Sequence, residues 1–286
     1  MRRYKHYSVA VASFIVLILT MVGCNAGTGG SSDTSELKVQ LDSCRLADTT
    51  SFVKSNGERC TIYADANISY PKMFRDKAST EQLQRLFAAF VLNAPDSLDL
   101  ADAMHATVSN TLHQYDFVEQ LPEDELNEDV DSSQIVYKYN TITTVAVHYN
   151  NDDIVTFCKT EMVRKNDKVT SVTHRYYSFD LKTMAYIDLH KLFREDAMTD
   201  VTHLLRARLL EQNKVVSDDQ LNDLGYFNVD NLSVTRNFFF DEKGVTWSYL
   251  PSQLAVDAVG EPQITLSYEQ LAPLACDGSV LNRLID

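Results

Sequence analysis

The fold is constrained most by three neighbouring runs in which apolar and polar side chains alternate, at residues 144–149, 154–163 and 169–179. Successive side chains of a β-strand point to opposite faces of a sheet, so a period of two residues predicts strands. The dipeptide Asn166-Asp167 separates the last two runs and has the composition of a tight turn. The segment therefore predicts an antiparallel meander.

Helical patterns and a further hairpin accompany the meander. Apolar residues at intervals of three or four predict helices that start at Ser79 and Ser97, a helix over 196–213, and a short one from Ser267 to Leu274. Strands are expected at 61–69, 234–240, 245–250 and 263–266. Gly244 supplies the positive φ that a turn between the middle two requires. These elements predict an α+β fold, with a mainly antiparallel sheet and helices packed on one face.

The N-terminus has the composition of an export signal. A basic start precedes an apolar run from Val9 to Val22, which is shorter than the 18 or more residues of a membrane span. The run ends in Met21-Val22-Gly23-Cys24, which resembles the lipobox of bacterial lipoproteins, with Met21 in place of the usual Leu. We therefore expect a signal peptide at residues 1–23 and acylation of Cys24, palmitate included. An uncleaved anchor and an ordinary signal that contains a cysteine are the alternatives.

Residues 24–40 are rich in Gly and Ser and predict a flexible tether behind the lipid. The predicted location is thus the cell envelope, at the outer membrane, with attachment through the N-terminal lipid. The sequence does not distinguish its periplasmic from its surface face. Removal of the three basic residues of the signal changes the formal charge from −14 to −17. Such acidity disfavours nucleic acid as a partner and favours a basic protein, although solubility alone also explains it.

Four cysteines remain once Cys24 carries lipid: Cys44, Cys60, Cys158 and Cys276. Disulfides persist in an oxidising compartment, and four cysteines allow three pairings, among which the sequence does not choose. Cys44 with Cys60 is the local option, and it leaves Cys158 with Cys276. A metal site is the rival interpretation, but the sequence has no Cys-x-x-Cys pair and no His at ligand spacing. No cofactor is expected.

An acidic stretch at 119–133 divides the chain. It lacks the Gly of a calcium-binding loop, so a solvated loop is the preferred interpretation. We place a domain boundary there, between an N-terminal module at 41–130 and a C-terminal domain at 131–286.

Two motifs resemble the RsiV-type extracellular domain family. The first is Tyr177-Ser178-Phe179-Asp180-Leu181-Lys182-Thr183 with Ile187-Asp188-Leu189 and Leu192-Phe193, and the second is Phe240-Asp241-Glu242-Lys243-Gly244-Val245 with Tyr249, Pro251, Leu254-Ala255 and Gly260. Residues 60–115 resemble the N-terminal companion module of that family. The family includes the outer domain of a lysozyme-sensing anti-sigma factor, domains joined to peptidoglycan deacetylases, and many lipoproteins. The resemblance implies a binding or sensing module without enzymatic activity of its own.

The chain departs from the family at two places. The family's Gly-Gly-Ala-His-Gly is replaced by residues 170–175, where only His174 is kept, and its Tyr-Glu-Ile-Ala is replaced by residues 252–255. A ligand that is recognised through those glycines or that Glu is therefore not implied here.

No sequence motif of a hydrolase, metalloprotease or phosphate-binding loop is present. His174 and Asp180 are the strongest catalytic candidates, but we do not expect them to form a direct His–Asp pair. The candidate binding residues are His174, Trp247, Tyr249 and Tyr177, because aromatic side chains stack on sugars and anchor protein loops. The favoured hypothesis is a lipid-anchored envelope module that binds a cell-wall glycan or a lysozyme-like basic protein. A structural or assembly lipoprotein is the alternative, and a hydrolase that uses His174 is a weaker one.

Overall fold

The computed structural model describes residues 38–53, 58–115 and 136–285. The predicted signal peptide, Cys24 and the whole acidic stretch at 119–133 lie outside these residues. Among the described residues, no helix has both the length and the apolar character that a membrane crossing requires.

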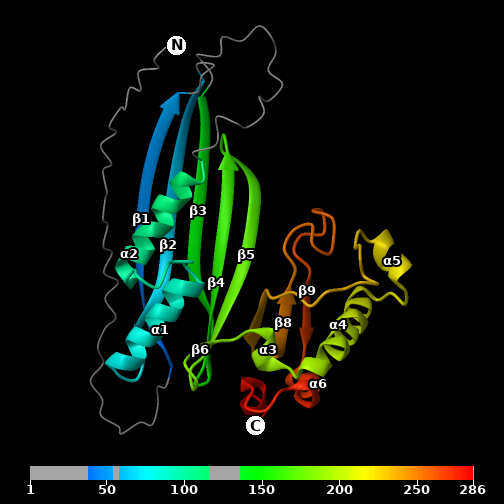
Figure 1. Cartoon of the computed structure of the whole chain (residues 1–286). Coiled ribbons are helices and arrows are strands. Elements are labelled where there is room, and N and C mark those ends of the chain that lie inside the picture. Colours follow the sequence, from blue (N-terminus) through cyan, green and yellow to red (C-terminus); the bar gives the residue numbers. More distant parts are fainter. Residues whose placement is uncertain (1–37, 54–57, 116–135, 286) are drawn as a thin grey trace, which may run out of the picture.

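A six-stranded sheet forms the larger half of the molecule (Figure 1). Its strands, in spatial and chain order, are β1 (Gln40–Val53), β2 (Arg59–Met73), β3 (Val136–Asn150), β4 (Ile154–Lys165), β5 (Lys168–Asp180) and β6 (Ala185–Tyr186). The expected meander is confirmed as β3, β4 and β5, which pair antiparallel. The pair β2–β3 is parallel and joins strands from both sides of residue 130. The sheet is thus continuous across the position where the sequence suggested a domain boundary.

Two helices, α1 (Lys77–Phe90) and α2 (Leu100–His113), cover one face of this sheet (Figure 1). The α+β prediction is therefore confirmed. The ring centroids of Phe87 in α1 and Phe157 in β4 lie 4.8 Å apart in an edge-to-face contact inside this layer. Helix α1 begins two residues before the predicted Ser79, because the side chain of Asp76 accepts a hydrogen bond from the Ser79 N–H and caps the helix.

The smaller half contains a three-stranded antiparallel sheet and short helices. Its elements are α3 (Leu189–Leu192), η3 (Glu195–Ala197), α4 (Met198–Asn213), α5 (Asp218–Asp223), β7 (Phe238–Asp241), β8 (Gly244–Ser248), β9 (Gln263–Leu266), α6 (Tyr268–Leu271), η4 (Ala272–Leu274) and η5 (Val280–Arg283). The predicted hairpin is confirmed as β7–β8, and Ser267 caps α6 as expected. Strand β8 lies between β7 and β9, and this sheet has an apolar core of its own with α4.

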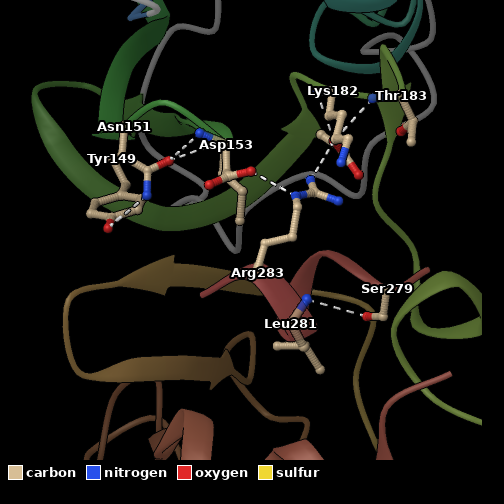
Figure 2. A network of polar contacts seen from close by, with 10 residues as sticks. Tyr149, Asn151, Asp153, Lys182, Thr183, Ser279, Leu281 and Arg283 are labelled. Carbon is tan, nitrogen blue, oxygen red and sulfur yellow. Dashed lines mark hydrogen bonds and ion pairs between the residues drawn. The ribbon is translucent and has the colours of Figure 1, made fainter. Parts of the chain in front are cut away.

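Asn237 and Arg283 connect the two halves. The Asn237 side chain accepts a hydrogen bond from the Tyr176 N–H and donates to the carbonyls of His174 and Ser248, over 2.9 to 3.0 Å. It thereby bonds the outer edge of β5 to the end of β8. Arg283 in η5 bonds Asp153 at the start of β4 (Figure 2) and also Asp180 at the end of β5.

The disulfide expectation requires correction, since no disulfide joins Cys44, Cys60, Cys158 or Cys276 in the described part of the chain. The register of β1 with β2 opposes Cys44 to Ile68 and Cys60 to Phe52. Cys44 and Cys60 are therefore eight residues apart along the strand pair, a separation of about 26 Å. A disulfide needs the two Cα atoms within about 7 Å of each other. Cys158 faces Tyr176, and the thiol of Cys276 donates to the Lys191 carbonyl.

Candidate functional site

A cleft of about 720 Å³ opens between β5 and the segment 250–262, which links β8 to β9. Most of its lining side chains are polar: Thr170, Ser171, His174, Ser252, Asp257, Glu261 and Gln263. We call it the β5 cleft. Its size lies within the range of small-molecule sites, about 300–1,000 Å³. The two carboxylates among these residues favour a ligand with hydroxyl groups or positive charge.

His174 and Glu261 form the best-defined contact in the β5 cleft. The Nδ1 atom of His174 lies 2.9 Å from Oε2 of Glu261, and the His174 backbone N–H donates to Oε1 over 3.1 Å. The Glu261 side chain is 13% exposed and the His174 side chain 38%. The carboxylate is thus held at both oxygens by one residue. This contact fixes the segment 250–262 to β5 and leaves part of the imidazole facing the cleft.

Tyr176 and Cys158 lie behind this pair as cross-strand neighbours on β5 and β4. Burial raises the pKa of Tyr176 well above its ordinary value, and the neighbouring Cys158 raises it further. Burial also raises the pKa of the Cys158 thiol. A thiol is a nucleophile only as the thiolate, so Cys158 is not activated here. The chemistry that these residues offer is hydrogen bonding to a ligand.

Trp247 and Tyr249, predicted as binding contacts, are buried instead. Trp247 is 0% exposed, and its ring centroid lies 6.3 Å from those of Phe193 and Phe238. The Tyr249 hydroxyl donates to the Ser233 carbonyl inside the smaller half. The prediction was wrong because β8 is a central strand with both faces covered, so all five of its residues are buried.

The other predicted binding residues differ in position. Tyr177 is half-buried against the core beneath α1, and His174 alone of the four lines the β5 cleft. Asp180, whose pairing with His174 we did not expect, bonds Arg283. Glu261 and Asp257 were missed because they lie in an irregular segment with no periodicity. The sequence signals nearby were Pro251, Leu254-Ala255 and Gly260, which belong to the second family motif.

The described residues contain no group of three His, Cys, Asp or Glu side chains arranged to hold an ion.

Comparison with known proteins finds a similarity in part of the smaller half. Residues 190–269 match DUF3298, a protein family of unknown function. No curated protein matches the chain. The DUF3298 match spans α3 to α6 and includes the segment 250–262. It does not include β5, which supplies the other wall of the β5 cleft.

Solved structures of DUF3298 proteins resemble the whole described fold. A family member from Bacteroides fragilis NCTC 9343 is 18% identical, with a TM-score of 0.68 over 86% of this chain and 97% of its own. A DUF3298 family protein from Pseudomonas aeruginosa PAO1 is 14% identical, with a TM-score of 0.50 over 85% of this chain and 97% of its own. At such identities the likeness establishes a shared fold.

Proposed function

We propose that this chain is a lipid-anchored binding module of the cell envelope and that the β5 cleft holds its ligand. The single observation that carries the proposal is the His174–Glu261 contact inside an open, polar cleft. A fixed histidine and carboxylate with neighbouring hydroxyl and amide groups provide directed hydrogen bonds at no further cost in side-chain ordering. The lipobox at Cys24 supports the location, and the RsiV-type resemblance with its companion module supports a sensing role.

The ligand is either a cell-wall glycan or a lysozyme-like basic protein. Asp257 and Glu261 both line the cleft and accept hydrogen bonds only, which suits sugar hydroxyls, amino groups and the side chains of Lys and Arg. The acidic net charge of −14 would accelerate the approach of a basic protein. A complex with a basic protein should therefore weaken with added salt, whereas a complex with a neutral glycan should not.

The test is calorimetric titration of the full chain against lysozyme and, separately, against solubilised peptidoglycan fragments. We expect saturable binding of one of them. The variants Glu261→Gln and His174→Ala should each weaken it about tenfold, the effect of losing a hydrogen bond to a charged group. Glu242→Gln and His203→Ala are matched controls, because both residues are exposed and lie outside the β5 cleft.

Two outcomes would contradict the proposal. One is the absence of heat with both ligands from a demonstrably folded chain. The other is binding that both cleft variants leave unchanged. In either case a structural or assembly role would become the better hypothesis, and a search for envelope partners by co-purification would follow.

A further inference from the structure

A second cleft, of about 690 Å³, lies where the two halves of the molecule meet. Its lining residues come from α1, from β6 and α3 with the residues beside them, from Met198 at the start of α4, and from residues 234–238, which lead into β7. None of its lining residues belongs to the β5 cleft. We call it the junction cleft.

The walls of the junction cleft are mainly apolar. Nine of its thirteen lining residues have apolar or aromatic side chains, contributed by both halves of the molecule. Phe90 of α1 is 40% exposed, although its ring stacks on Tyr186 with centroids 4.3 Å apart. Met184 and Met198 also line the cleft, with half-buried side chains. Methionine adapts its shape to irregular apolar ligands, so these walls favour a flexible hydrocarbon.

The remaining lining residues give the junction cleft a local excess of basic groups. They are His190, Lys191 and Arg236, with Asp188 as the one acid. The Asp188 carboxylate already accepts the backbone N–H of Lys191 as the cap of α3. Lys191 donates one hydrogen bond from Nζ to the Tyr186 carbonyl over 3.0 Å and has two donors left.

Arg236 is the decisive residue of this group. It is exposed, and no ion pair or hydrogen bond of its guanidinium is found with the residues that the structure describes. Its planar donors match a carboxylate in a bidentate arrangement.

We propose that the junction cleft binds a fatty acid, with its carboxylate at Arg236 and Lys191 and its chain along Leu86, Met184 and Met198. A sugar acid or free phosphate would bind the basic groups but leave the apolar walls exposed to water. A neutral lipid would use the walls and leave Arg236 without a partner. Only a ligand with one anionic end and one hydrocarbon chain complements both features of the cleft.

Calorimetric titration of the full chain with laurate tests this proposal. We expect saturable binding of one laurate per chain, weaker binding of octanoate, and none of acetate, because each lost CH₂ removes apolar contact. Dodecyltrimethylammonium has the same chain length with the opposite charge and should bind at least about tenfold more weakly than laurate.

Two variants locate the site. Arg236→Ala should weaken laurate binding about tenfold or more, and Arg236→Lys should restore part of it because the charge is kept. Arg175→Ala is the matched control, since Arg175 is an exposed arginine of β5 outside the junction cleft. The proposal is overturned if laurate does not bind, if dodecyltrimethylammonium binds equally well, or if Arg236→Ala and Arg175→Ala have the same effect.

Discussion

At the scale of single residues, Arg283 joins the most distant parts of the chain. Its Nε donates to Asp153 over 2.6 Å and its Nη2 to Asp180 over 2.7 Å, across 130 and 103 residues of sequence. The Asp180 side chain is only 8% exposed, so its charge depends on this partner (Figure 2 shows the arginine between the two halves). A buried carboxylate that loses its cation is strongly unfavourable.

We therefore expect Arg283→Ala to lower the free energy of unfolding by about 3 kcal/mol, because it leaves Asp180 buried without its cation. Urea denaturation followed by circular dichroism measures this change. Arg45→Ala is the control: Arg45 pairs with Asp65 on the exposed face of β1 and β2 and should cost less than about 1 kcal/mol. Equal losses in the two variants would contradict the assigned role of Arg283.

The same contact predicts a dependence on pH. Burial raises the pKa of Asp180, but hydrogen bonds from Arg283 and from the N–H groups of Thr183 and Lys182 outweigh it, so the pKa is below its ordinary value. The unfolded chain then binds the proton more readily than the folded one. The stabilisation is full above the unfolded pKa of about 3.9 and is lost as the pH falls through the lower folded pKa.

We accordingly expect the stability difference between the wild type and Asp180→Asn to be largest near neutral pH and to shrink as the pH falls below about 4. Urea titrations at a series of pH values measure it. A difference that stays constant over that range would show that Asp180 is not a stabilising carboxylate.

At the scale of secondary structure, the β7–β8 turn depends on one glycine. Gly244 has a φ of 150°, and a Cβ atom there would lie 2.0 Å from the backbone oxygen of Leu266 on β9. The central strand β8 can thus approach β9 closely only because this position lacks a side chain.

Gly244→Ala should therefore destabilise the protein by about 2 kcal/mol or more, since backbone atoms must move apart. Gly278→Ala is the matched control, because Gly278 also has positive φ, of 77°, but open space around its Cα. It should cost only about 1 kcal/mol of backbone strain. Thermal or urea unfolding of the two variants distinguishes steric clash from strain, and equal costs would argue against the clash.

The sequence predicted most elements because their patterns are local. Periodicity or turn residues in the sequence indicate the meander, the β7–β8 hairpin and the helix over 196–213. Strand β1 was missed because it is an edge strand with mostly polar, partly exposed side chains, which weakens alternation. The parallel β2–β3 pair was missed because pairing partners separated by a long connection leave no local pattern.

The candidate site was predicted less well because its residues, too, come together from distant parts of the sequence. His174 was identified from a family motif, but its partner Glu261 is 87 residues away and becomes a neighbour only when the two halves meet. Trp247 was predicted to contact a ligand because we expected one face of its strand to be exposed to solvent. Both faces of β8 are covered, so Trp247 is buried.

At the scale of the whole molecule, both clefts exist only because the two halves are held in one arrangement. The β5 cleft has one wall from the large sheet and one from the segment 250–262, and the junction cleft also has walls from both halves. Asn237 bonds the backbone of β5 beside His174, so it positions the wall of the β5 cleft directly. Loss of this side chain should loosen the site without changing any residue that contacts the ligand.

We therefore expect Asn237→Ala to lower the free energy of unfolding by about 2–3 kcal/mol, because the N–H of Tyr176 and two carbonyls lose their partner. Hydrogen exchange should show faster exchange of the Tyr176 amide, which the Asn237 side chain protects, while amides in the centre of β3 and β4 stay protected. Asn231→Ala is the control: Asn231 is exposed and its side chain donates to the neighbouring Asp230, so this variant should leave both measurements unchanged. If the Tyr176 amide exchanges at the wild-type rate in Asn237→Ala, the halves are held by their apolar contacts and by Arg283, and the geometry of the β5 cleft does not depend on Asn237.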